Sequence, residues 1–186
     1  SMGGQVGLTL ALEAPEQVRR LALVSPAGIE PFTPKEGEAL KQATTAEGII
    51  TSTDEQVRQN TALNFAEWSD EYAWIIEQRH ALSERDDFEA YAKDNARSLA
   101  GMLEGKVRDR LGEIDVPALV LFGAGDKLIP NQYLHADMTT ADVAERARET
   151  LPNATVKLVD DAGHLLMLER PSVFREALRS FLNERD

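Results

Sequence analysis

Three polar residues of this 186-residue chain occupy positions where nucleophilic catalysis could use them. Ser1 precedes an apolar helix-like run, Asp126 follows the apolar segment ALVLF, and His164 follows the segment TVKLV. Glycines directly before Asp126 and His164 allow a sharp backbone turn, so each side chain can face the end of a sheet. A hydroxyl nucleophile, an imidazole base and a carboxylate that orients the base are the parts that acyl transfer needs. The pattern therefore predicts a hydrolytic site made of these three residues.

Other polar residues near these segments have simpler explanations. Asp160 and Asp161 lie closer to His164 along the chain, but acids three or four residues away are expected in a solvated turn. Ser25 and Ser52 are rival nucleophiles by type only, because neither has the small-residue setting of Ser1.

Metal chemistry finds little support in the sequence. His80 lies in a predicted helix, where a surface or packing role is expected, and His135 with Asp137 supplies two possible ligands at most. There is no cysteine, which excludes disulfides, thiolate zinc sites and a cysteine nucleophile. We expect no metal and no cofactor.

Strand-like and helix-like segments alternate at both ends of the chain. Apolar runs predict buried strands at residues 21–24 and 118–122, and residues 155–159 are predicted to form the next strand. Amphipathic runs predict a first helix that ends at Pro15, a helix over ADVAERARETL capped by Thr139 or Thr140, and a last helix that begins near Pro171. Strands separated by helices indicate a parallel sheet with right-handed crossovers, which is an α/β fold.

The middle of the chain has a different pattern. Strand signals disappear between residues 35 and 112, and the segments EYAWIIEQRHAL and FEAYAKDNARSLAGML carry apolar residues at helical spacing. We expect helices there that cover the sheet. Trp68 and Trp74 are candidates for contacting a substrate, although packing inside this helical region is the simpler role.

The amino-acid composition and net charge limit the kinds of molecule that the chain is expected to bind. With 42% hydrophobic residues the chain can form a core, and 20 basic against 32 acidic residues give a net charge of −12. Such a charge disfavours nucleic acids and anionic membranes as partners. No apolar run approaches the length of a membrane span, and no signal-like segment precedes the first helix. We expect a cytoplasmic protein that acts on a small molecule.

Three motifs together resemble the α/β-hydrolase superfamily, in its cap-bearing esterase-like branch. They are SMGG, VPALVLFGAGDKLIP and DDAGHLLMLERPSVFREALRSFL, which look like the nucleophile elbow, the acid loop and the histidine loop. The resemblance implies a Ser1–His164–Asp126 triad and an oxyanion hole that includes the backbone N–H of Met2. It also implies a division into core residues 1–34, a helical cap at 35–112 and core residues 113–186.

The elbow motif departs from the family pattern G-x-S-x-G, because only Ser1-Met2-Gly3 matches it. The resemblance implies that earlier strands, and the loop with the second oxyanion donor, would precede Ser1. We therefore expect the chain to be the C-terminal part of such an enzyme, with its N-terminal strands missing. Alternatively, Ser1 is a remnant of tag cleavage; an aspartate before Met2 would then resemble epoxide hydrolases and dehalogenases.

The predicted function is hydrolysis of small apolar esters, or related acyl compounds, through an acyl-enzyme. Carbon–carbon bond hydrolases of the same fold remain an alternative. A second interpretation is that the chain is catalytically incomplete and needs a separate N-terminal half or a second copy of itself. An N-terminal nucleophile hydrolase, with the Ser1 amine as base, would leave the loops at Asp126 and His164 unexplained.

Overall fold

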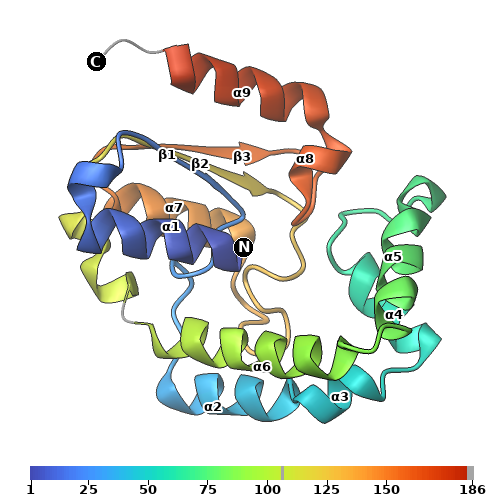
Figure 1. Ribbon diagram of the computed structural model, residues 1–186. Coiled ribbons are helices and arrows are strands. Elements are labelled where there is room, and N and C mark those ends of the chain that lie inside the picture. The colour runs from blue at the N-terminus through green and yellow to red at the C-terminus, as the bar shows by residue number, and fades with distance from the viewer. Residues whose placement is uncertain (106, 184–186) are drawn as a thin grey trace. The chain divides into compact units, whose positions relative to one another are not determined.

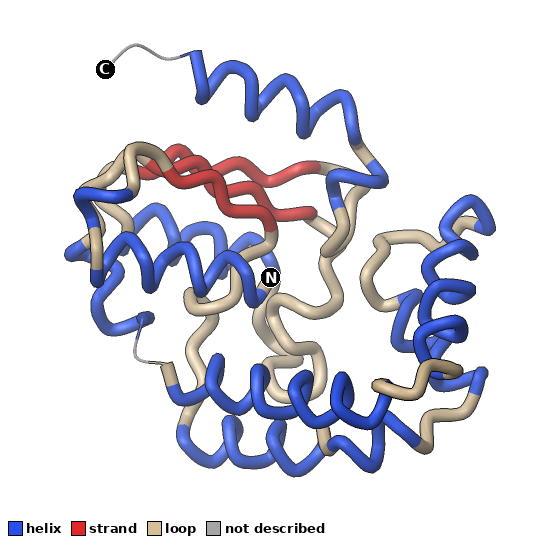
Figure 2. The backbone as a smooth tube through the Cα atoms, in the orientation of Figure 1, coloured by secondary structure: helices blue, strands red, loops and turns tan. Residues whose placement is uncertain are grey.

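The computed structural model describes residues 1–105 and 107–183, which form two compact units. The first unit contains residues 1–31, 63–67 and the described residues beyond 106; the second contains residues 32–62 and 68–105. Figure 1 shows the order of their helices and strands along the chain, and Figure 2 colours the same backbone by secondary structure. The middle of the sequence thus supplies most of the second unit, while residues 63–67 return to the first.

Within the described residues, the strands form one parallel sheet in the order β1-β2-β3. The strands are β1 (Leu21–Val24), β2 (Ala118–Gly123) and β3 (Ala154–Val159), so all three predicted strands are confirmed. Every residue of the central strand β2 is buried, as its uninterrupted apolar sequence predicts. The prediction that the whole of β1 is buried is wrong at Ala22, which is exposed on this edge strand.

Helices of the first unit cover both faces of the sheet (Figure 1). They are α1 (Met2–Glu13), η1 (Pro15–Gln17), η3 (Val107–Glu113), α7 (Thr140–Thr150), α8 (Leu166–Glu169) and α9 (Pro171–Asn183). The predicted first, capped and last helices are confirmed. Thr139 is the cap of α7, because its hydroxyl accepts the Asp142 N–H while the Asp142 carboxylate accepts the Thr139 N–H.

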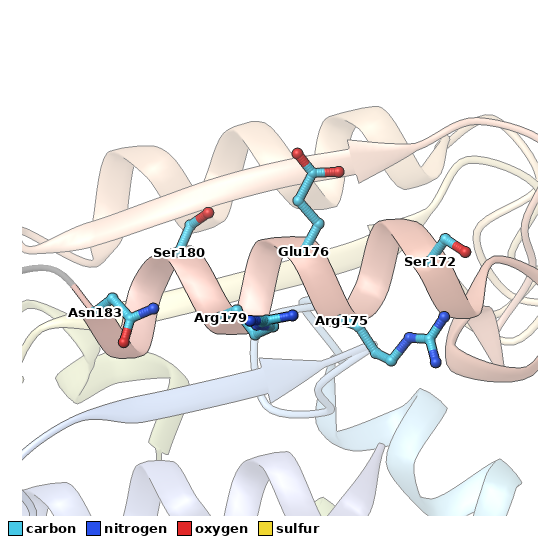
Figure 3. Close-up of a pocket in the computed structure, with 6 residues that line it drawn as sticks. All are labelled: Ser172, Arg175, Glu176, Arg179, Ser180 and Asn183. Carbon is cyan, nitrogen blue, oxygen red and sulfur yellow. The ribbon is translucent and has the colours of Figure 1, made fainter.

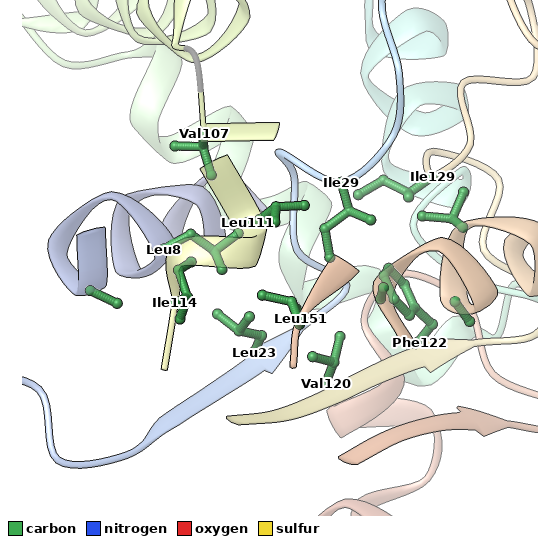
Figure 4. Close-up of a cluster of buried hydrophobic side chains, with 14 residues drawn as sticks. Leu8, Leu23, Ile29, Val107, Leu111, Ile114, Val120, Phe122, Ile129 and Leu151 are labelled. Atoms are coloured by element: carbon green, nitrogen blue, oxygen red, sulfur yellow. The ribbon is translucent and has the colours of Figure 1, made fainter. Parts of the chain in front are cut away.

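Successive side chains of β2 point to opposite faces of the sheet, so they contribute to two separate hydrophobic clusters. Val120 and Phe122 belong to a cluster with Leu8 of α1 and Val143 of α7, most of which is drawn in Figure 4. Leu119 and Leu121, with the opposite side-chain direction, pack in a second cluster with Ala177 and Phe181 of α9. One short strand therefore holds helices on both of its faces, and its carboxyl end is fixed from both sides.

Helix α1 approaches the sheet closely through small residues. A Cβ on Gly4 would lie 2.6 Å from Cβ of Pro26, directly after β1, and a Cβ on Gly7 would lie 3.1 Å from Leu21. The N-terminus of α1 is therefore held against the carboxyl end of β1, which places Ser1 at that edge of the sheet.

The second unit is helical in all its described secondary structure. Its helices are α2 (Pro34–Ala43), α3 (Ala46–Ile50), α4 (Asp54–Ala62), η2 (Asp70–Tyr72), α5 (Ala73–Ser83) and α6 (Phe88–Glu104). Helices α2 and α3 pack on α6, and α4 packs on α5. The helical pattern of the middle region is thus confirmed. Over the described residues, no helix is both long and apolar enough to cross a bilayer.

Candidate active site

Asp126 lies in the loop that follows β2 and is almost completely buried. Its Oδ1 accepts the backbone N–H groups of Leu128 (2.8 Å) and Ile129 (3.1 Å), which locks the carboxylate into a turn. Thr140, at the start of α7, donates its hydroxyl to the Ile129 carbonyl and so fixes the far side of the same turn. The second oxygen, Oδ2, remains for another partner.

That partner is His164, in the loop after β3. Its Nδ1 lies 2.8 Å from Asp126 Oδ2, and the two side chains are 6% and 0% exposed. An ionised carboxylate can only accept, so Nδ1 carries the proton and Nε2 of the neutral imidazole is an acceptor. An imidazole held in this tautomer can remove a proton from a hydroxyl group.

The two loops are joined by their backbones as well as by this pair. The Ala124 N–H donates to the Val159 carbonyl, and the Gly125 N–H donates to the Ala162 carbonyl, both at 2.8 Å. A Cβ on Gly123 would lie 2.1 Å from the Gly163 carbonyl oxygen, so only glycine permits this approach. Gly123, at the end of β2, therefore allows the two loops to come together.

Ser25 has a supporting position in this arrangement. It is buried, adopts a φ of 41° directly after β1, and donates its hydroxyl to the His164 carbonyl at 3.0 Å. The structure thus uses Ser25 to hold the histidine loop from the β1 side, which leaves its hydroxyl engaged.

Ser1 lies at the same edge of the sheet, as the N-cap of α1. Its carbonyl accepts the Ala27 N–H at 3.0 Å, and its amine donates to the Val24 carbonyl at 3.0 Å. Burial lowers the pKa of this amine, and the negative charge of Asp126 opposes that shift. None of the hydrogen bonds between described residues joins the Ser1 hydroxyl to His164.

Met2 is the first residue of α1. Its N–H therefore has no carbonyl partner within the helix, and the helix dipole favours negative charge at this end. The position suits a donor to a developing oxyanion next to Ser1.

A second buried carboxylate lies behind the Asp126 loop. Glu30 accepts the Asn131 N–H at 2.7 Å and hydrogen-bonds to His135 Nδ1. Burial raises the pKa of Glu30, the two hydrogen bonds and the His135 charge lower it, and the charge of Asp126 raises it further. His135 is thus paired with Glu30, which the sequence did not indicate.

Two hollows border the first unit. One of about 330 Å³ is lined by residues of the Asp126 loop and the start of α7: Ala124, Asp126, Lys127, Pro130, Gln132, His135, Ala136, Met138, Thr139 and Thr140. The other, of about 440 Å³, runs along α9 (Figure 3) and is lined by Ser172, Arg175, Glu176, Arg179, Ser180 and Asn183. The α9 hollow contains none of the predicted catalytic residues.

The remaining predicted residues belong to the second unit. Trp68 packs edge-on against Tyr72, with ring centroids 6.3 Å apart, and Trp74 is 51% exposed on α5. His80 Nδ1 lies 3.7 Å from Asp54, at the surface. Across the residues that the structure describes, no group of three or more His, Cys, Asp or Glu side chains is placed to hold a metal ion.

One acidic residue at the site escaped the sequence reasoning. Glu169, in α8, accepts the Gly163 N–H directly before His164. Its position in the sequence, shortly after His164, could have indicated this role, because a carboxylate in the first turn after the histidine loop can reach back to the N–H groups of that loop.

Comparisons with known proteins identify a family fold that extends over most of the chain. The family model described as alpha/beta hydrolase fold matches residues 1–171. A putative carbamate hydrolase of Azorhizobium caulinodans is 28% identical over 100% of this chain and 65% of its own length. A carboxylesterase of Bacillus subtilis is 28% identical over 98% of this chain and 55% of its own length.

Solved structures give the same result. A probable hydrolytic enzyme from Pseudomonas aeruginosa has a TM-score of 0.74 and 28% identity, over 99% of this chain and 62% of that one. The chain thus spans less than two thirds of the length of each of these three proteins.

Proposed function

Because this chain belongs to the alpha/beta hydrolase family, we propose that it carries the triad of a serine hydrolase that cleaves small apolar carboxylic esters. Ser1 is the nucleophile, His164 the general base and acid, and Asp126 the residue that orients the imidazole. The observation that carries the proposal is the buried Asp126–His164 hydrogen bond of 2.8 Å, at the sheet edge where Ser1 is anchored.

The chemistry proceeds in two steps. His164 Nε2 takes the proton from the Ser1 hydroxyl while Oγ attacks the ester carbonyl, and the Met2 N–H stabilises the oxyanion that forms. The imidazolium then gives its proton to the departing alkoxide, which leaves as the alcohol. Water, deprotonated by His164, attacks the acyl-enzyme and releases the carboxylic acid and free Ser1.

The names of two relatives support hydrolysis at a carbonyl group, but they do not specify one substrate. One is named a carboxylesterase and another a putative carbamate hydrolase, and in both names the bond cleaved is next to a carbonyl group. The apolar, small substrate proposed here also suits a chain with a net charge of −12, which would repel anionic substrates.

Labelling with a fluorophosphonate probe tests the proposal directly. We expect one covalent adduct, located on Ser1 by peptide mapping, and no adduct in the His164→Ala variant, because the hydroxyl reacts only when a base removes its proton. Ser52→Ala, in the helical second unit and outside both loops, serves as the matched control and should label like the parent chain.

Two results would count against the triad. An adduct on a serine other than Ser1 would reassign the nucleophile. No adduct on a chain that circular dichroism shows to be folded would mean that this chain alone does not assemble a working site.

A further inference from the structure

Glu169 bridges two segments that are far apart in the sequence. Its Oε2 accepts the Gly163 N–H at 2.6 Å, and its Oε1 accepts the Ala66 N–H at 2.9 Å across 103 residues of sequence. Both hydrogen bonds run from a neutral N–H to a carboxylate, which makes them stronger than bonds between neutral groups. One partly buried side chain therefore fixes the peptide before His164 relative to residue 66.

Ala66 belongs to a short segment, Asn64–Ala66, that we call the strap. The strap accepts the Leu165 N–H on the Asn64 carbonyl at 3.0 Å and the Lys127 ammonium on the Ala66 carbonyl at 2.9 Å. Phe65, between them, is completely buried. The strap is thus bonded to the histidine loop on one side and to the acid loop on the other.

Glycines permit both loops to touch the strap. A Cβ on Gly163 would lie 2.5 Å from the Ala66 nitrogen, and a Cβ on Gly125 would lie 2.8 Å from the Ala66 Cβ. At these distances a side chain on either glycine would collide with the strap, so both loops lie directly against it. We therefore expect a change in the Glu169 bonds to reach the backbone of both His164 and Asp126.

We propose that Glu169 is a positioning residue for His164, which acts by clamping the histidine loop onto the strap. It touches neither the substrate nor the reacting atoms. The strap passes the constraint to the acid loop through Lys127, and the result is the separation of 2.8 Å between the imidazole and Asp126. The catalytic part of this inference rests on the proposed serine hydrolase function.

The decisive variant is Glu169→Gln. An amide of the same shape keeps one acceptor oxygen but turns its NH₂ group toward the other N–H, so one of the two bonds is lost. The control is Glu176→Gln, which makes the same chemical change at an exposed position on α9. Thermal unfolding of both variants gives the folded fraction, to which rates are normalised.

We expect kcat of Glu169→Gln to fall roughly 10- to 100-fold with little change in KM, because small errors in the position of a catalytic group act on the chemical step. The fall should be larger for an ethyl ester than for the matching p-nitrophenyl ester. An alkoxide must be protonated by His164 as it leaves, whereas p-nitrophenolate leaves without a proton. A variant that merely lowered the folded fraction would reduce both rates equally.

A second readout does not depend on hydrolysis. In ¹⁵N-labelled protein, the Nδ1–H proton of His164 and the Gly163 amide report the two ends of the clamp, and His164→Ala assigns the first. Glu169→Gln should shift or broaden the imidazole signal and speed amide exchange at Gly163, while Glu176→Gln should leave both unchanged. If Glu169→Gln does not fold, Glu169→Asp, which keeps the charge but shortens the reach, replaces it with the same expected changes.

The outcomes separate the two proposals. An unchanged imidazole signal and a protected Gly163 amide in a folded Glu169 variant would overturn the positioning role, whatever the activity. Absence of esterase activity in the parent chain, together with the expected shifts, would leave the clamp in place and count against the proposed reaction.

Discussion

His164 is held by contacts of three different kinds at the residue scale. Asp126 binds the imidazole, Ser25 donates to the backbone carbonyl, and Glu169 accepts the N–H of the preceding residue. The first contact sets the tautomer, and the other two set the position of the backbone. Asp126 is itself bound by two N–H groups through its other oxygen, so its carboxylate cannot turn away.

Asp126→Asn tests which acid orients the imidazole. The amide oxygen can still accept the Leu128 and Ile129 N–H groups, so the loop should keep its shape, but the NH₂ group then faces Nδ1 and favours the wrong tautomer. We expect kcat for a p-nitrophenyl ester to fall by about 10⁴-fold, as in serine proteases that lose this acid. Asp160→Asn, at an exposed neighbouring position, should change kcat little; a comparable loss there would contradict the assignment of Asp126.

At the element scale, the site depends on how closely α1 meets the end of β1. Ser1 and Met2 are the first residues of this contact, and the Ala27 N–H ties Ser1 to the segment after β1. The helix can come this close because the side facing Pro26 has no side chain at Gly4. Ser1, the proposed nucleophile, is thus positioned by helix–strand packing and not by a loop.

Gly4→Ala tests this packing, with Gly3→Ala as its control on the same helix. A Cβ at Gly4 would lie 2.8 Å from the backbone Cα of Pro26, whereas a Cβ at Gly3 meets nothing within 4 Å. We expect Gly4→Ala to lower the free energy of unfolding by about 1–3 kcal/mol through overpacking. Gly3→Ala should be neutral or stabilising by up to about 1 kcal/mol. Denaturant unfolding measures both, and equal effects would show that the helix can move away without cost.

Taken as a whole, the molecule carries many more acidic than basic residues, and most of the ion pairs seen between described residues are at the surface. Exposed pairs of this kind contribute little to stability. Glu30 differs, because it is buried and links the segment after β1 to the acid loop through Asn131 and His135. Its ionisation therefore has consequences for the stability of the first unit.

Glu30→Gln should change how stability depends on pH. Burial raises the pKa of Glu30 above its ordinary value of 4.5, so the folded state binds its proton more tightly than the unfolded state does. The free energy of unfolding should therefore fall as pH rises from 4.5 through the folded-state pKa, and level off above it. Glu30→Gln removes this fall and still offers an oxygen to the Asn131 N–H.

Denaturant unfolding of both proteins from about pH 4 to 8 gives the comparison. Asp87, Glu89 and Asp142 have lowered pKa values, so their opposite contribution lies at lower pH and is the same in both proteins. Parallel stability curves would contradict an effect of Glu30.

Most of the secondary structure followed from local chemistry in the sequence. The apolar run of β2 cannot be exposed, Pro15 cannot continue α1, and Thr139 with Asp142 forms a reciprocal cap. The segments that bear Asp126 and His164 were recognisable for the same reason, because a strand-like run followed by glycine favours a strand that ends in a tight turn. These signals act over a few residues and need no knowledge of distant contacts.

The joining of those segments was decided by the tertiary structure alone. Nothing local indicates that Glu30 meets His135, or that Ser25 holds a carbonyl from beyond β3, because such contacts depend on the order of strands in the sheet. The strap is the clearest case, since its residues resemble a loop between helices. Its Phe65 is nevertheless buried, and its backbone is bonded to the loops that carry Asp126 and His164. Sequence determined which residues could take part in catalysis, and packing at the sheet edge decided which of them are held together, because position in space depends on contacts that span the whole chain.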